Sequence, residues 1–260
     1  ISIYQVLANS FNRHIKMIEI KLTIMVPVYM EAENIGPTID VIKSVLSKTG
    51  TSNYEILIID CLRPDGTDDG TPAIAEQLAK ENSFIRHIHN NRCVNLGYKY
   101  RQGIKEAQGE YYMMIPGDNE TEEQAIINVL EKLGQADIII ASTSNPEIRP
   151  LKRRVVAEVF NIICNFISGL NLRHYNGINL HKTEILRKLP TKVDNLVYSA
   201  DIIIRSIKSG LAKTYIEVPM PLRPQPNRKT NSFQGNNIAS ALLTFAGLFW
   251  DIRIKRKPLP

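Results

Sequence analysis

Two stretches decide the fold, Leu22-Thr-Ile-Met-Val-Pro-Val28 and Glu55-Ile-Leu-Ile-Ile-Asp60. Both are short and almost wholly apolar, which is typical of strands buried on both faces of a parallel sheet. Each is followed by a helical pattern, from about Pro37 to Leu46 and from Thr71 to Lys80. Strands that alternate with helices predict an α/β fold with a mostly parallel central sheet flanked by helices.

The alternation of strand and helix continues to about Ala141. The residues from Thr121 to Gln124 have the spacing of a capping box, which predicts the start of a helix that ends at Gly134. The other segments expected here are a strand Phe84–His89, a helix Tyr98–Ala107, a strand Tyr111–Ile115 and a strand Asp137–Ala141.

The second half of the chain is richer in helical patterns. Residues Val155–Leu172 carry an apolar stripe at helical spacing. The last apolar segment, Ile238–Trp250, has 13 residues, and at about 1.5 Å per residue it is too short to cross the roughly 30 Å core of a bilayer. We expect an amphipathic helix there. The domain boundaries that we expect are an N-terminal extension 1–21, a main domain 22–234 and a C-terminal helical segment 235–260.

The charge of the chain is concentrated at one end. Its 260 residues include 32 Lys and Arg against 26 Asp and Glu, a net charge of +6, and 43% of residues are hydrophobic. These values exclude a disordered or collagen-like chain and fit one globular domain. Seven basic residues and one acid follow residue 222, so the whole excess lies there. A basic end of this kind predicts a phosphate-bearing partner.

The three cysteines are too scattered for a disulfide framework, which favours a reducing compartment. No apolar run reaches the roughly 18 residues of a spanning helix, and the N-terminus lacks the pattern of a cleaved signal peptide. We therefore expect no membrane-spanning helix.

Two short patterns look like metal sites but lack the usual context. His87 and His89 lie two apart, and so on one face of a strand, close to Cys93. Residues from Asp65 to Glu76 have the acidic spacing of a calcium loop, but a strand precedes them where that loop needs a helix. Both patterns are more typical of ordinary strand and loop composition.

Polar residues follow three of the expected strands, in the segments Val26–Ile35, Ile59–Thr67 and Ile115–Glu120. Taken singly, each is ordinary turn chemistry, because Asp, Gly and Pro are common in loops. Ligands of open α/β sheets bind outside the carboxyl ends of the strands. Together, the three segments predict one binding site at one edge of the sheet.

With these residues the chain resembles the inverting glycosyltransferase family 2, and within it the branch of the dolichol-phosphate-mannose synthases. The resemblance covers roughly Leu22 to Trp250 and implies the GT-A fold and a nucleotide-sugar donor. The residues that carry it are Pro27, Tyr29, Glu31, Asn34, Ile35, Asp60, Pro64 to Thr67, Asn95 to Gly97, Gly103, Asp118 and Gly177.

The resemblance implies roles for several of these residues and for Glu120. Asp118 would be catalytic, and with Glu120 it would bind Mg²⁺ or Mn²⁺, for which one or two carboxylates with donor phosphates and water suffice. The residues that it places at the donor nucleotide are Pro27, Tyr29, Glu31, Asp60 and Asp118.

Two positions depart from the pattern of the family. Cys61 stands where the family has a second aspartate after the second strand, and Pro116 replaces the first carboxylate of the Asp-x-Asp metal motif. These losses leave open a protein that binds nucleotide or membrane with weakened catalysis.

Two basic stretches are expected to bind phosphate. In related synthases a lipid phosphate is received before the helix that corresponds to Val155–Leu172, and a basic loop closes over donor and acceptor phosphates. A charge run is equally typical of a solvated face. The residues concerned are Arg149, Lys152, Arg153 and Arg154 in the first stretch and Arg223, Arg228 and Lys229 in the second.

Asp201 has two interpretations. Family members with hydroxyl acceptors carry an acid there, which would make Asp201 a catalytic base, whereas a phosphate acceptor is already anionic at neutral pH. Alternatively, Asp201 caps its helix or pairs with Arg205, four residues on.

These observations predict an inverting glycosyltransferase that moves a sugar from a nucleotide sugar to a polyprenyl phosphate. We expect a peripheral protein on the cytoplasmic face of a membrane, in contact with an anionic membrane surface. Nucleic acid is not an expected partner, because aromatic residues are not interleaved with the basic end. The alternatives are transfer to a glycan hydroxyl with Asp201 as base, or the weakened binding protein described above.

Overall fold

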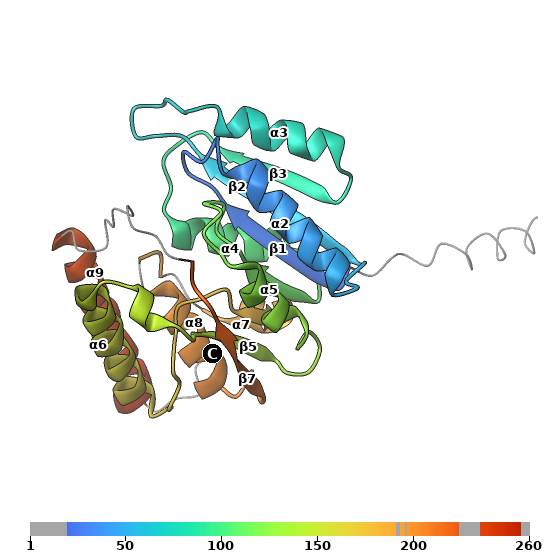
Figure 1. Ribbon diagram of the computed structural model, residues 1–260. Coiled ribbons are helices and arrows are strands. Elements are labelled where there is room, and N and C mark those ends of the chain that lie inside the picture. The colour runs from blue at the N-terminus through green and yellow to red at the C-terminus, as the bar shows by residue number, and fades with distance from the viewer. Residues whose placement is uncertain (1–19, 191–192, 196, 224–234, 256–260) are drawn as a thin grey trace, which may run out of the picture.

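A computed structural model describes residues 20–190, 193–195, 197–223 and 235–255 of the chain (Figure 1). Within these ranges seven strands form one sheet, in the order β3-β2-β1-β4-β6-β5-β7. Of these, β6 runs antiparallel to its neighbours and the others are parallel, so the prediction of a mostly parallel sheet is confirmed. The strands are β1 (Leu22–Pro27), β2 (Tyr54–Cys61), β3 (Ile85–Asn90), β4 (Tyr111–Met114), β5 (Ile138–Thr143), β6 (Leu180–Lys182) and β7 (Tyr215–Met220).

Helices cover both faces of this sheet. One layer consists of α2, α3 and α5, and the other contains α4, α7 and α8. Successive strand residues point to opposite faces, so Ile24 and Val26 contact the first layer and Met25 contacts the second. This double cover explains why the central strands are continuously apolar. The helices are α2 (Ile35–Lys48), α3 (Thr71–Glu81), α4 (Leu96–Glu106), α5 (Glu123–Leu130), α7 (Thr183–Lys188) and α8 (Tyr198–Lys208).

Two longer helices, α6 (Leu151–Ser168) and α9 (Gly235–Phe249), pack against each other at the lower left of Figure 1. The ring centroids of Phe160 and Phe245 are 5.5 Å apart across their contact. A C-terminal helix is therefore present where the sequence predicted one. The division of the chain after residue 234 stays a prediction. The expected phosphate-binding residues Arg228 and Lys229 lie outside the described residues. The expected N-terminal extension also lies outside them, up to residue 19.

The end of α6 is tied to the segment that follows α9. Arg253 lies in a single π-helical turn, η2 (Trp250–Ile254), that continues α9. Its guanidinium donates to the carbonyl oxygens of Phe166 and Ile167 at 2.7 and 2.9 Å. Carbonyls in the last turn of a helix lack an intrahelical donor, so Arg253 caps α6.

The start of α5 differs from the predicted capping box. The helix begins at Glu123, and Glu122 occupies the cap position without a side-chain hydrogen bond to the backbone. Thr121 forms an isolated antiparallel bridge with Leu222. The capping-box prediction is wrong, because the helix begins one residue later than that spacing requires and Thr121 pairs instead with a segment that is distant in sequence.

The helix α6 begins earlier than expected, after a short 3-10 turn η1 (Pro146–Ile148). Its first turn therefore contains Lys152, Arg153 and Arg154, and no acid. Cations at the positive end of a helix dipole are unfavourable by about 0.3–1 kcal/mol each. An anion bound at this end of α6 would offset that cost.

Candidate functional site

The loops that follow β1 and β4 meet at the carboxyl edge of the sheet. The backbone N–H of Gly117 donates to the carbonyl oxygen of Pro27 at 3.1 Å. A Cβ atom at Gly117 would lie 2.3 Å from Cγ1 of Val28, so only glycine allows the two loops to approach this closely. Asp118, the next residue, is thereby held beside the end of β1.

Asp118 and Glu120 belong to one tight turn. The backbone N–H of Glu120 donates to Oδ1 of Asp118 at 3.1 Å. Asn119 between them has a φ of 53°, a left-handed conformation that asparagine tolerates. Its N–H donates to Oγ1 of Thr38 at 3.0 Å, which fixes the turn to α2. Both carboxylates are therefore presented by a loop that is held in place.

Glu31 brings a third carboxylate close to this turn. Its Oε2 accepts a hydrogen bond from Nδ2 of Asn34 at 2.7 Å. Burial raises the pKa of Glu31, the bond from Asn34 opposes that rise, and the charges of Asp118 and Glu120 add to it. A divalent cation would relieve this repulsion, and carboxylate oxygens are the ligands that Mg²⁺ and Mn²⁺ prefer. The residues present therefore fit the expected ion.

A buried cation supports the end of β1. Lys99 of α4 is 3% exposed, and its Nζ donates to the carbonyl oxygen of Val28 at 2.5 Å. The same Nζ lies 5.8 Å from the centroid of the Tyr29 ring. Lys99 holds the loop that carries Tyr29 and Glu31. Sequence reasoning missed it, because no sequence signal shows that one lysine of an amphipathic helix points inward.

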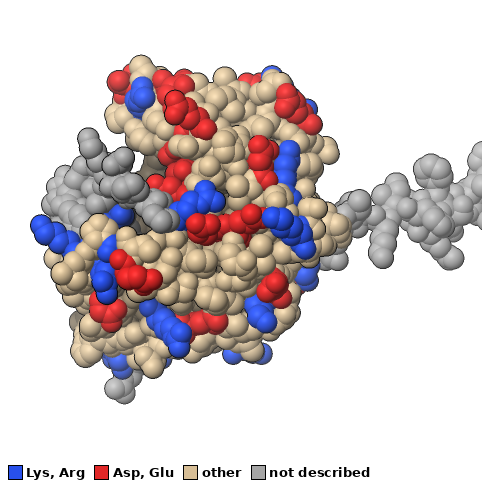
Figure 2. Space-filling view, in the orientation of Figure 1, with Lys and Arg blue, Asp and Glu red and all other residues tan. Residues whose placement is uncertain are grey.

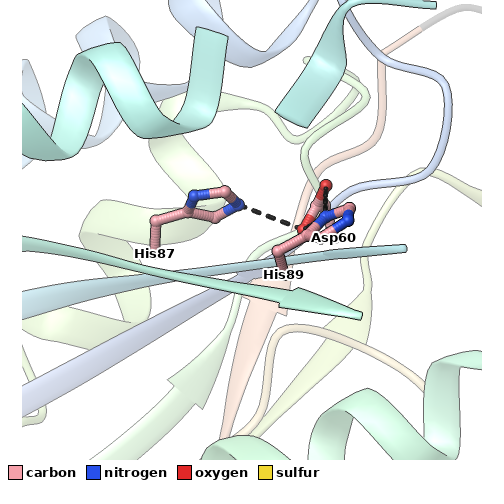
Figure 3. Close-up of side chains that lie close together, drawn as sticks. All are labelled: Asp60, His87 and His89. Atoms are coloured by element: carbon pink, nitrogen blue, oxygen red, sulfur yellow. Dashed lines mark hydrogen bonds and ion pairs between the residues drawn. The ribbon is translucent and has the colours of Figure 1, made fainter. Parts of the chain in front are cut away.

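Asp60, expected at the nucleotide, is buried and bound by two histidines of β3 (Figure 3). Nε2 of His87 lies 3.0 Å from Oδ1 of Asp60, and Nδ1 of His89 lies 2.9 Å from Oδ2. Burial raises the pKa of Asp60, but the hydrogen bonds and charges of the two histidines outweigh burial and lower it overall. The carboxylate is therefore ionised at neutral pH.

A cavity of about 470 Å³ opens at this edge of the sheet. Asp118 and Glu120 line it, and so do Arg149, Arg153 and Arg223. In Figure 2, acidic side chains lie along a hollow in the left half of the face shown. The structure thus brings the expected metal-binding carboxylates and three of the expected phosphate-binding arginines into one cavity.

Arg154 belongs to a different cavity from Arg153. It lines a neighbouring space of about 340 Å³ together with Arg173. Successive residues of a helix point about 100° apart, which explains why the two adjacent arginines are separated. Arg149 and His174 line both cavities.

His174 contributes a neutral ring to the cavity wall. Burial lowers its pKa to about 4, and the nearby charge of Arg149 acts in the same direction. The imidazole is therefore uncharged at pH 7. His174 directly precedes the segment that contains Gly177, and that adjacency was the available signal for a residue that sequence reasoning missed.

Comparison with known proteins identifies the family. The sequence profile of Glycosyl transferase family 2 matches residues 23–189, more than half of the chain. The chain belongs to glycosyltransferase family 2. The family assignment that the loops after β1, β2 and β4 predicted is confirmed.

Two curated relatives are similar to this glycosyltransferase along most of its length. It is 24% identical over 221 residues to glycosyltransferase AglD of Haloferax volcanii, a match that covers 82% of this chain and 34% of AglD. It is 25% identical over 243 residues to polyprenol monophosphomannose synthase of Mycolicibacterium smegmatis, which covers 88% of this chain and 86% of that protein. The chain therefore spans about a third of the length of AglD and most of the synthase.

A solved structure confirms the fold of this glycosyltransferase. Glucosyl-3-phosphoglycerate synthase from Mycobacterium tuberculosis, in complex with Mn²⁺, uridine diphosphate and glucosyl-3-phosphoglycerate, matches with a TM-score of 0.62. The match covers 87% of this chain and 80% of that protein at 16% identity. The predicted α/β architecture of the GT-A type is confirmed.

In this family 2 glycosyltransferase Asp201 lies outside the lining of the cavity. Tyr198 and Ser199 of α8 line the cavity, whereas Asp201 is fully buried. Its Oδ1 accepts a hydrogen bond from Nε of Arg205 at 2.7 Å, and Nη2 of Arg205 binds Oδ2 of Asp251 at 2.9 Å. The predicted pairing with Arg205 is confirmed, and the role of Asp201 as a base stays a prediction.

Cys61, which stands where the family has an aspartate, is the last residue of β2 and is buried. Its Sγ lies 3.5 Å from the carbonyl oxygen of Val94 in a weak hydrogen bond. Pro27 and Tyr29 lie at the end of β1, as expected for this glycosyltransferase, and Tyr29 is 45% exposed. The contact of Pro27, Tyr29, Glu31 and Asp60 with a nucleotide stays a prediction.

Proposed function

We propose that this protein transfers a sugar, with inversion, from a nucleotide sugar to a polyprenyl phosphate at a membrane surface. The observation that carries the proposal is a single cavity lined both by the Asp118–Glu120 turn and by Arg149 and Arg153. Similarity to a polyprenol monophosphomannose synthase over most of both chains supports this acceptor.

The donor would bind at the edge formed by β1, β2 and β4. Pro27, Tyr29 and Glu31 would contact the nucleotide, while Asp118 and Glu120 would hold Mg²⁺ or Mn²⁺ beside the diphosphate. When bound, such an ion neutralises the charge that develops on a leaving diphosphate. The carboxylates are already fixed by the turn, so they need no rearrangement to receive it.

The acceptor would bring its own nucleophile. A phosphate monoester has a second pKa of about 6 and is largely dianionic at neutral pH. One of its oxygens attacks the anomeric carbon from the face opposite the diphosphate, and the bond to the diphosphate breaks with its electron pair. Arg149 and Arg153 would orient the phosphate, because guanidinium groups bind phosphate oxygens in pairs. This chemistry needs no general base, which agrees with the engagement of Asp201 by Arg205.

The side of α6 opposite Arg153 is apolar and open to solvent. Its side chains recur at intervals of three or four residues, and each is at least 49% exposed. α9 and η2 also carry large apolar side chains that are exposed. The helices α6 and α9 pack against each other, and the ring centroids of Phe166 and Phe249 lie 6.4 Å apart. A large exposed apolar surface is typical of a protein or membrane contact. We call the following residues the outer apolar face: Leu151, Val155, Val159, Ile162, Phe166, Leu242, Leu243 and Trp250.

The outer apolar face would rest on lipid. The prenyl tail of the acceptor would then stay in the bilayer on one side of α6. Its phosphate would reach Arg153 on the other side. We place this contact on the cytoplasmic face, where anionic lipid attracts basic segments. In the described part of the chain, no helix has the length and apolar character needed to cross a bilayer.

Replacing Arg153 with alanine is expected to lower kcat/KM for polyprenyl phosphate about 10- to 100-fold. A hydrogen bond to a charged group contributes about 1.5–3 kcal/mol, and 1.4 kcal/mol corresponds to a factor of ten. Lys208→Ala is the control, because this exposed lysine at the end of α8 lines neither cavity. The measurement is transfer of labelled sugar to prenyl phosphate. Equal losses in both variants would contradict the proposed acceptor site.

Placing charge on the outer apolar face is expected to abolish liposome binding. Each buried large apolar side chain contributes about 1.5–3 kcal/mol, so Phe166→Glu with Leu243→Glu should weaken partitioning at least about 100-fold. The control is Tyr215→Glu, which changes an exposed residue of β7 outside this face. Co-sedimentation with anionic liposomes measures the effect. If the double variant still sediments, or if it changes only self-association, the membrane role of this face is wrong.

A further inference from the structure

We propose that Asp60, His87 and His89 bind a second divalent ion of the zinc class, independently of the Asp118–Glu120 turn. Asp60 and His89 lie directly opposite each other in the register of β2 and β3, and His87 is two residues away on the same face. The three potential ligand atoms lie within 4.8 Å of one another. Figure 3 shows both imidazole rings turned toward the carboxylate.

The donor atoms select the class of metal. Two imidazole nitrogens and one carboxylate oxygen suit Zn²⁺ and its neighbours in the first transition row, whereas Mg²⁺ and Mn²⁺ prefer oxygen alone. Bonds of about 2.0–2.2 Å place neighbouring ligand atoms about 3.3 Å apart in a tetrahedral site. Oδ1 of Asp60 lies 3.0 Å from Nε2 of His87 and 3.0 Å from Nδ1 of His89. The three ligand atoms lie within 4.8 Å of one another, so side-chain rotations that bring all three separations to about 3.3 Å would admit the ion.

The exposed fraction of the side chain increases from Asp60 to His87 to His89. The side chain of Asp60 is 1% exposed, that of His87 is 11% exposed and that of His89 is 32% exposed. A buried, ionised carboxylate attracts a dication more strongly than an exposed one, because water screens it less. The exposed edge of His89 provides the entry path. Three protein ligands leave a fourth position for water, as in zinc sites that are not closed by protein.

Metal binding would replace hydrogen bonds by coordination bonds. A neutral ring that donates its N–H to Asp60 must carry its proton on the other nitrogen before the facing nitrogen can bind the ion. Exchange with water makes this transfer, and a doubly protonated ring releases one proton to solvent. The carboxylate of Asp60 keeps its charge and changes its partners only.

The test is a calorimetric titration of the whole chain with ZnCl₂ in a buffer without other divalent ions. One site is expected in the wild type. His87→Gln and His89→Gln should each weaken it by at least the roughly 10- to 100-fold that loss of an outer-shell partner costs. Asp118→Asn and Cys93→Ser are the controls that should keep full affinity. Asp118→Asn removes a ligand of the proposed donor site, and Cys93→Ser removes an exposed thiol.

A second readout separates binding from folding. ZnCl₂ should raise the unfolding temperature of the wild type and of both controls, and raise that of the two histidine variants less at the same concentration. His89→Gln alters the most exposed of the three side chains and so is the variant least able to disturb the core. Absence of zinc binding in the wild type, equal affinity in the histidine variants, or loss of binding in either control would overturn the proposal. Sugar transfer is not measured, so the outcome is independent of the proposed function.

Discussion

Asp118→Asn is expected to lower kcat about 100- to 1000-fold. A metal ion on the diphosphate contributes several kcal/mol to transition-state stabilisation, and each 1.4 kcal/mol corresponds to a factor of ten. The asparagine keeps the size of the side chain, and its amide oxygen can still accept from the N–H of Glu120, so the turn should persist. The loss would then report on the charge of Asp118.

The loss should be accompanied by a change in metal dependence. Calorimetry of nucleoside diphosphate with and without Mn²⁺ should show tighter binding with the ion in the wild type and little difference in Asp118→Asn. Glu184→Gln, an exposed acid of α7, is the control that should behave as the wild type. If both proteins bind nucleoside diphosphate with the same affinity with and without Mn²⁺, the assignment of Asp118 and Glu120 as ligands of the ion is wrong.

Asp201→Ala is expected to lower the free energy of unfolding by about 3 kcal/mol or more. Removing one partner of a buried ion pair leaves the other charge buried without compensation, which costs about 3–5 kcal/mol. Asp201 is fully buried and Arg205 is 13% exposed, so Arg205 would be the stranded charge. Its second bond, to Asp251, is expected to retain part of the stability. Denaturant unfolding measures the change.

The same variant distinguishes a structural role from a catalytic one. Arg205→Ala should destabilise the protein comparably, and the double variant should cost less than the sum of the two single variants. Transfer to prenyl phosphate, assayed far below the unfolding temperature, should change less than about tenfold, whereas loss of a general base typically costs about 10²- to 10⁴-fold. A loss of that size on a glycan acceptor, with unchanged unfolding, would favour the glycan-hydroxyl alternative.

The layered fold could be predicted because its strands are buried on both faces. The runs that begin at Leu22 and Glu55 have no polar alternation, and only a sheet covered by helices on both sides accommodates that pattern. Parallel order then brings the loops after β1, β2 and β4 to one edge. The cavity lined by Asp118 and Arg153 therefore lies at the edge of the sheet where the sequence predicted a binding site.

The features that escaped prediction depend on contacts between distant segments. Thr121 pairs with Leu222, which removed the expected cap. The spacing of His87 and His89 carried little information until β3 was placed beside β2 with Asp60 opposite. Periodicity identified an apolar stripe on α6 but could not tell whether it faced the core or the solvent. In each case the missing information was the partner, which is set by tertiary packing.

The two-sided character of α6 makes the proposed reaction a surface reaction. An enzyme that docks through the outer apolar face meets its acceptor by lateral diffusion within a lipid layer. Turnover should then follow the mole fraction of acceptor in the bilayer. Adding inert phospholipid should slow transfer even when the total amounts of enzyme and acceptor are unchanged. A short-chain prenyl phosphate dissolved in water would escape this dilution, and the encounter would again depend on bulk concentration.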